Sequence, residues 1–189
     1  MSEINLLSAQ FCSDVNAVLG DYWRGYYSDA LAECDTRLKE HSSDLLEWER
    51  LFIQAIQIYL RTWDQDKACI KFLRALDLPP VSKSDIEAQW IRFYQQLLYT
   101  WLCCQERANR DRLYDAREYA DRAANMLTRM KREPVAEFAE PLEKYPFLPR
   151  PWCIFWFRAL ARYALAANDE ARKDFERAHR ELRFLSESR

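Results

Sequence analysis

Glycine and proline are scarce in this chain of 189 residues, and both are confined to a few places. The two glycines stand at Gly20 and Gly25, and the seven prolines fall at Pro79–Pro80 and between Pro134 and Pro151. Sheet proteins need many tight turns built from such residues, so the long runs without them favour helices. The sequence therefore predicts an all-α protein.

Side chains that catalysis or cofactor binding would need are also few. The two histidines, His41 and His179, adjoin no cysteine or serine that they could activate as a nucleophile. The Glu-x-x-His spacing at Glu176 occurs once, whereas di-iron bundles need two such motifs and two further carboxylates. A phosphate-binding loop needs more glycines than the chain has. We expect no enzymatic activity, no cofactor and no bound metal.

The cysteines and the apolar stretches give no sign of secretion or of a membrane. Six cysteines are present, but none forms a Cys-x-x-Cys pair typical of a zinc or redox site. The N-terminus lacks the basic start and the apolar core of a secretory signal. The most apolar stretch is interrupted by Arg158 and Arg162, so no run is long enough to span a bilayer. These features predict a cytoplasmic protein with reduced thiols.

Charge is nearly balanced overall but uneven along the chain. The net charge of −2 provides no general attraction to nucleic acid. Residues 1–50 hold ten acids and four bases, a net charge of −6, which leaves +4 for the remaining residues of a chain at −2. Hydrophobic residues make up 49% and charged residues 31%, a balance typical of globular proteins. We expect protein partners rather than nucleic acid or membrane.

A recurring pattern of small and large residues predicts helical hairpins. It is clearest at Ala68, Phe72 and Ala75, which share one helix face and are followed by Pro80. A matching apolar stripe around Phe52 precedes it, with a turn expected near residues 62–66. The spacing returns, with some substitutions, at three further places: Ala30–Cys34–Arg37, Ala116–Ala120–Ala123 and Ala171–Phe175–Ala178.

This pattern resembles the tetratricopeptide (TPR) repeat, in which a bulky stripe is followed by Ala-x3-Phe and then Pro. Equivalent alanines at 30, 68, 116 and 171 are 38, 48 and 55 residues apart, against a family period of 34. The resemblance implies one domain over residues 1–189, an irregular α–α hairpin superhelix of about four hairpins. Their expected limits are 4–41, 43–80, 83–132 and 151–187, with a proline-rich insertion at 134–151.

Turn residues set the expected helix boundaries. We expect a first helix from residue 4 to about Gly20 and a turn between Gly20 and Gly25. A long helix is expected over 84–108, a charged turn at 109–112, and a last turn at Asn168–Asp169. The insertion holds five prolines, which rules out one continuous helix. We expect a short helix at about 135–144 and an extended segment, with three aromatic residues packed onto helices: Phe138, Tyr145 and Phe147.

The resemblance also implies where a partner would bind, because the first helix of each TPR hairpin faces a concave groove. The candidate partner-binding residues are then Arg50, Ile53, Gln57, Leu60, Arg61, Trp156, Arg158, Leu160, Arg162 and Tyr163. Ile53 and Gln57 stand where some relatives carry carboxylate-clamping residues, so we do not expect heat-shock-protein tails to bind. Arg158 and Arg162 have two open interpretations: they pair with internal acids, or they bind an acidic partner segment in a wet groove.

The resemblance implies a non-enzymatic adaptor or regulator that holds a partner peptide or helix in the groove. One alternative is a small cytosolic chaperone for a secreted or assembling client, with which the isoelectric point near 5.8 agrees. Another is a helical-bundle enzyme or ligand carrier, which no motif of the sequence supports. The oligomeric state is not predicted.

Overall fold

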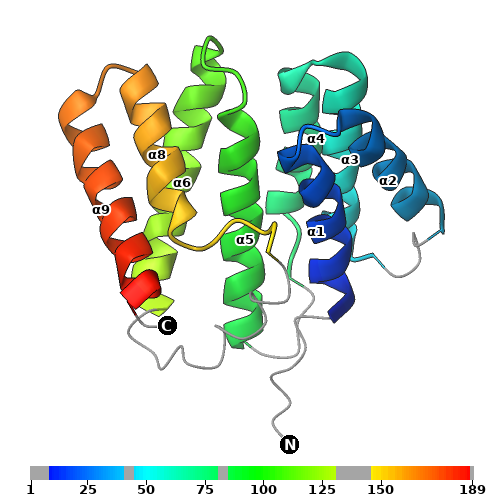
Figure 1. The fold of residues 1–189 in the computed structure, drawn as a ribbon, viewed down its shortest axis with the longest axis horizontal. Coiled ribbons are helices and arrows are strands. Elements are labelled where there is room, and N and C mark those ends of the chain that lie inside the picture. The colour runs from blue at the N-terminus through cyan, green and yellow to red at the C-terminus, as the bar shows by residue number, and fades with distance from the viewer. Residues whose placement is uncertain (1–8, 41–44, 81–84, 131–145, 188–189) are drawn as a thin grey trace, which may run out of the picture. The chain divides into compact units, whose positions relative to one another are not determined.

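The computed structural model describes residues 9–40, 45–80, 85–130 and 146–187 (Figure 1). Every regular element within these ranges is an α-helix, which confirms the all-α prediction. The chain divides into two compact units, which we describe separately. Unit 1 comprises Met1–Ile91 and Glu133–Leu148, and unit 2 comprises Arg92–Arg132 and Pro149–Arg189. The superhelix implied by the TPR resemblance stays a prediction.

In its described residues, unit 1 contains four helices, each packed against its neighbour in the chain, and the start of a fifth. They are α1 (Ala9–Trp23), α2 (Tyr27–Glu40), α3 (Glu47–Thr62), α4 (Gln65–Leu76) and the start of α5 (Asp85–Cys103). Phe52 of α3 and Phe72 of α4 are both fully buried, and their ring centroids lie 5.1 Å apart. This contact confirms that Phe72 is buried between paired helices. The alanines Ala30, Ala68 and Ala75 are also fully buried, as their spacing predicts.

Unit 2 contains the rest of α5, α6 (Arg110–Met130), α8 (Cys153–Ala164) and α9 (Asn168–Glu187). Helix α8 packs against both α6 and α9 (Figure 1). Tyr99 of α5 meets Tyr119 of α6 with ring centroids 4.8 Å apart. Three alanines of α6 are fully buried and allow close packing: Ala116, Ala120 and Ala123.

Phe175 differs from the prediction that it is buried between paired helices. It is only half-buried, and its ring lies 5.0 Å from that of Trp156, which is itself 46% exposed. The physical reason is its place in the unit, since α9 packs mainly on α8 and leaves one side of this hairpin open. The same sequence pattern that buries Phe72 in the α3–α4 hairpin therefore leaves Phe175 partly in solvent.

Helix boundaries follow the prediction at one turn and depart from it at four places. One is the end of α5, which stops at Cys103 and not at the expected residue 108. Helix α3 ends at Thr62, and Asp64 caps α4 by accepting a hydrogen bond from the Lys67 backbone N–H at 2.9 Å. Gly20, however, lies inside α1, and the turn is formed by Gly25, whose φ of +78° is accessible to glycine without strain. Helices α6 and α9 also begin earlier than predicted, inside the expected turns at 109–112 and 168–169.

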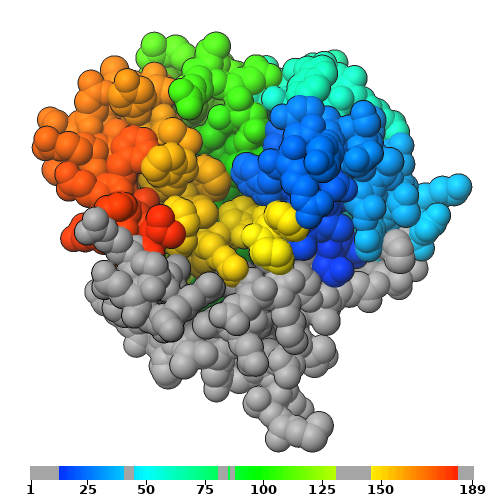
Figure 2. Space-filling view, in the orientation of Figure 1, coloured from blue at the N-terminus to red at the C-terminus, as the bar shows by residue number. Residues whose placement is uncertain are grey.

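The proline-rich insertion is described only at its end. Phe138, Tyr145 and the expected short helix at 135–144 lie outside the described residues. Phe147 packs onto α1, with its ring beside Gly20, which confirms the prediction for this residue. In Figure 2 the yellow segment that begins at residue 146 lies against the blue of α1. Leu148, the next residue, is buried.

Five cysteines lie in the described part with known side-chain surroundings, and none forms a disulfide. Cys34, Cys69 and Cys103 are buried, whereas Cys104 and Cys153 are half-buried. Burial, together with nearby acids, raises the pKa of Cys34 to about 12. Burial also raises the pKa of Cys153 to about 11. The Cys34 and Cys153 thiols are therefore protonated at neutral pH.

Candidate functional site

Helix α8 presents an exposed apolar stripe. Trp156, Leu160 and Tyr163 are four and three residues apart, so they share one helix face. Trp156 is 46% exposed, Tyr163 is 63% exposed and Leu160 is half-buried. The other faces of α8 enter the core through five buried residues: Ile154, Phe155, Phe157, Ala159 and Ala161. We call Trp156, Leu160 and Tyr163, together with half-buried Phe175, the α8 surface. Phe175 contacts Trp156.

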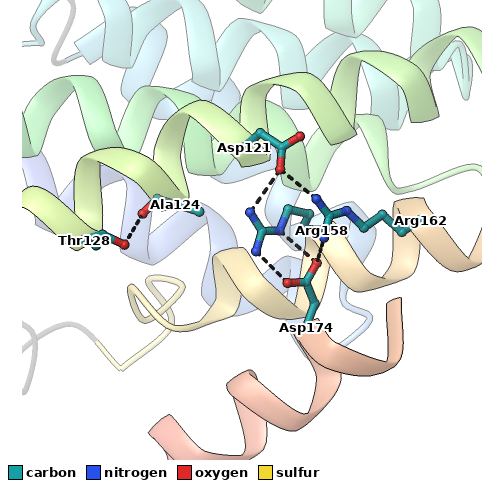
Figure 3. A network of polar contacts seen from close by, with 6 residues as sticks. All are labelled: Asp121, Ala124, Thr128, Arg158, Arg162 and Asp174. Atoms are coloured by element: carbon teal, nitrogen blue, oxygen red, sulfur yellow. Dashed lines mark hydrogen bonds and ion pairs between the residues drawn. The ribbon is translucent and has the colours of Figure 1, made fainter. Parts of the chain in front are cut away.

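Arg158 and Arg162 lie on the other side of α8 and are paired with two aspartates (Figure 3). Asp174 of α9 accepts hydrogen bonds from Arg158 Nε at 2.8 Å and Nη2 at 2.5 Å, and from Arg162 Nη1 at 2.8 Å. Asp121 of α6 accepts from Arg158 Nη1 and Arg162 Nη2, each at 3.0 Å. Two positive and two negative charges thus link three helices.

The pairing settles which of the two interpretations of these arginines the structure shows. The Asp174 side chain is 5% exposed, Arg158 is 12% exposed and Arg162 is 19% exposed. Burial alone would lower the pKa of Arg158, but hydrogen bonds and charges from Asp174 and Asp121 raise it above its ordinary value. The internal-pairing interpretation is the one observed. The cluster fixes the rotation of α8 and thereby the face that stays outside.

Two of the five candidates on α3 are core residues. Ile53 is fully buried and Leu60 is 7% exposed. The resemblance placed them in a groove, but α3 packs against α1, α2 and α4, which cover its apolar faces. A partner cannot reach either side chain in this arrangement.

The other three α3 candidates are polar and lie nearer the surface. Gln57 donates a hydrogen bond to Asp35 of α2, and Arg61 forms an ion pair with the same carboxylate at 2.7 Å. Arg50 pairs with Glu47, one turn earlier on α3. Contact between a partner and any of these three residues stays a prediction.

Sequence reasoning missed an aromatic cluster in unit 1, beside the α1–α2 turn and the α3–α4 turn. Trp63 is 55% exposed, and its ring centroid lies 5.5 Å from both Tyr27 and Tyr59. Tyr22 joins the cluster through Tyr27, at 5.4 Å. The available signal was that aromatic residues flank both turns of the first two hairpins, but only packing between α2 and α3 brings them together.

Unit 1 also buries acids without a matching number of bases. Asp14 of α1 and Glu49 of α3 are each 1% exposed. Arg37 of α2 pairs with Asp14 and with Glu33, at 2.6 Å from the latter. Glu49 Oε2 accepts a hydrogen bond from the Leu46 backbone N–H at 2.8 Å at the start of α3.

Glu49 is in an environment that disfavours its charge. Its Oε1 and the Oδ2 of Asp14 have no hydrogen-bond partner among the described residues. Burial, reinforced by the neighbouring charge of Asp14 and opposed by the Leu46 hydrogen bond, raises the pKa of Glu49 to about 8. Glu49 is therefore mainly protonated at neutral pH.

A comparison of the chain with protein-family models, curated proteins and solved structures finds no match. Across the described ranges, no helix is both long and apolar enough to cross a membrane. The same ranges contain no group of three or more metal-ligating side chains placed to hold an ion. Any functional conclusion has to come from the geometry of the two units.

Proposed function

We propose that this protein is a non-enzymatic, cytoplasmic adaptor or regulator that binds a segment of a partner protein at the α8 surface. The observation that carries the proposal is the exposure of Trp156 and Tyr163 on one face of a helix whose other faces are buried. Tryptophan and tyrosine are enriched among the residues that dominate binding energy at interfaces. The proposal includes a TPR-like arrangement, in which α8, the first helix of its hairpin, faces the partner.

The contacts around α8 support a preorganised binding face. Arg158 and Arg162 are held by Asp121 and Asp174, so α8 is fixed to the helices on both sides. A face that is already fixed loses little conformational entropy when a partner binds. The arginines thus position the surface rather than contact the partner. The expected partner segment is apolar at its centre, with acidic flanks that suit the net charge of +4 carried by residues 51–189.

The test is to replace Trp156 and Tyr163 with alanine together, and to compare partner capture with that of the wild type. Tyr114→Ala is a matched control, because Tyr114 is 45% exposed on α6 of the same unit. We expect the double variant to lose a partner that the wild type and the control retain, with little change in melting temperature. Equal capture by all three proteins would refute the α8 surface. One stoichiometric client would favour the chaperone alternative over an adaptor.

A further inference from the structure

The segment at Phe147 is held on α1 by both of its main-chain groups. Its backbone N–H donates to Asn16 Oδ1 at 2.9 Å, and its carbonyl accepts from Trp23 Nε1 at 3.1 Å. Asn16 and Trp23 are seven residues apart, so both side chains lie on the same face of the helix. Hydrogen bonds to main-chain groups hold a segment regardless of its side chains.

The ring of Phe147 is recognised between these two hydrogen bonds. Gly20 lies there, and a methyl group at this position would come within 2.9 Å of the ring. Glycine is less favourable than alanine within a helix, so helix propensity does not explain Gly20 inside α1. The close packing of the Phe147 ring does. The Arg24 guanidinium lies over the ring, 4.8 Å from its centroid, in a cation–π contact. This face of α1 therefore recognises both the main chain and the aromatic side chain of one residue in a turn.

The sequence around Phe147 suits such a site. The segment reads Pro146-Phe147-Leu148-Pro149, in which Pro146 and Phe147 form a turn and Leu148 a bend. Each proline fixes its own φ, and Pro149 also restricts the backbone of Leu148 before it. Little order then has to be imposed on binding. Trp23 is 46% exposed and Phe147 is half-buried, so solvent reaches the site.

We propose that Asn16, Gly20, Trp23 and Arg24 form a recognition site for a turn of a protein chain that carries phenylalanine directly after proline. Residues 146–148 are its intramolecular ligand, and a segment from a partner protein binds by displacing them. Because the internal ligand is tethered to the same chain, its effective concentration is high and binding from outside is weak until it is displaced. The site is separate from the α8 surface, and its failure would leave the proposed function untouched.

The test uses the full chain and a synthetic peptide of residues 145–151, Tyr-Pro-Phe-Leu-Pro-Arg-Pro. The peptide is titrated into wild-type protein and into Phe147→Ala, in which the internal ring is removed. The readout is the indole N–H resonance of Trp23, assigned with Trp23→Phe. We expect Phe147→Ala to bind the peptide at least about tenfold more tightly than the wild type, with a shift of this resonance.

Two controls make the result specific. A peptide with alanine in place of its phenylalanine should not bind. Adding Gly20→Ala to Phe147→Ala should also abolish binding, because the new methyl group occupies the place of the ring. If Phe147→Ala does not fold, Phe147→Leu serves in its place, since it keeps an apolar side chain but weakens the cation–π contact with Arg24.

The proposal is overturned if a folded Phe147→Ala or Phe147→Leu variant fails to bind the peptide, or binds the alanine peptide equally well. The segment would then be a structural strap only. It is also overturned if the wild type forms a concentration-dependent dimer that Gly20→Ala abolishes, because the segment would then be exchanged between two copies of this chain rather than displaced by a partner.

Discussion

The buried charges of the two units are paired in different ways. In unit 2, Asp121 and Asp174 face Arg158 and Arg162, so two negative charges meet two positive ones. In unit 1, Arg37 serves both Asp14 and Glu33, and buried Glu49 accepts only a backbone hydrogen bond among the described contacts. Removing charge from water is costly unless a partner compensates for it. In unit 2 each buried acid is paired with arginines, whereas in unit 1 the buried Glu49 is mainly protonated at neutral pH.

This difference in charge pairing predicts how the stability of each unit responds to pH and to mutation of a charged residue. The cluster in unit 2 depends on arginine, which stays protonated, and its stability should not vary around neutral pH. The cluster in unit 1 contains Glu49, whose pKa near 8 lies within the range of ordinary buffers. Unit 1 should therefore respond to pH, and unit 2 should respond to loss of a charge.

The largest effect is expected when the balanced cluster is broken. Replacing Arg158 and Arg162 together with glutamate would place four acids where two pairs stood. We expect a loss of at least about 3–5 kcal/mol in the free energy of unfolding, enough to unfold a domain of marginal stability. Circular dichroism melts measure this. Arg172→Glu on α9, a 71% exposed position, is the control and should change little. A double variant that melts like the wild type but loses its partner would return the arginines to a binding role.

A second comparison concerns the two phenylalanines that occupy equivalent positions in the repeat pattern. Phe72→Ala should cost about 3–5 kcal/mol, because the ring is fully buried against Phe52. Phe175→Ala should cost only about 1–2 kcal/mol, since part of its surface is already in water. Urea unfolding of both variants gives the two values. Equal costs would show that the α8–α9 hairpin is as closed as the α3–α4 hairpin.

The pH response of unit 1 is tested with Glu49→Gln. The pKa of Glu49 is about 8 in the folded chain, against an ordinary 4.5 when unfolded, so folding takes up a proton between these values. Its contribution to stability is full below pH 4.5 and is lost as pH rises to about 8. The slope is about 1.4 kcal/mol per pH unit. Glutamine stays neutral and still accepts the Leu46 hydrogen bond.

We therefore expect the stability of the wild type to fall, relative to that of Glu49→Gln, across this window. Urea unfolding at several pH values measures the difference. The control is Glu47→Gln, which removes a half-exposed acid two residues away and should leave the slope in place. Parallel curves for the wild type and Glu49→Gln would mean that Glu49 is charged in the folded protein.

The smallest effect is expected at an exposed ion pair. Arg50 and Glu47 form a salt bridge on the surface of α3, with side chains 42% and 49% exposed. Such pairs contribute little, so Arg50→Ala should change stability by less than about 0.5 kcal/mol. A thermal melt against the wild type measures this. A loss comparable to that of the unit 2 cluster would mean that exposure does not separate the two kinds of pair.

Local pattern was enough to predict the helices and much of the core. Scarce glycine and proline indicated the fold class, and helical spacing identified Ala68, Phe72 and Ala116 as buried. Gly20 was taken as a turn because glycine is a poor helix former. Inside α1 it lies against the ring of Phe147, more than a hundred residues away in the sequence, where a larger side chain would clash. A contact between residues so far apart cannot be predicted from a short stretch of sequence.

The same limit applies to the candidate site. The spacing of Trp156, Leu160 and Tyr163 was sufficient to place them on one helix face, and the structure exposes that face. The partners of Arg158 and Arg162 could not be chosen from sequence, since Asp121 lies 37 and 41 residues away. Ile53 and Leu60 were assigned to a groove by family resemblance, and burial against neighbouring helices decides their place instead.

Chemical labelling of the buried thiols can measure how often each unit opens. Of the buried cysteines, Cys34 and Cys69 lie in unit 1, and Cys103 lies in unit 2. A thiol-specific alkylating reagent has to reach the sulfur atom, so an enclosed cysteine reacts only while the chain around it is open. With Cys12→Ser, the rate at which mass increments accumulate at each cysteine in dilute urea reports the opening of one unit at a time. Identical rates at all three sites would show that the two units open as one body, and separate rates would show that each opens alone.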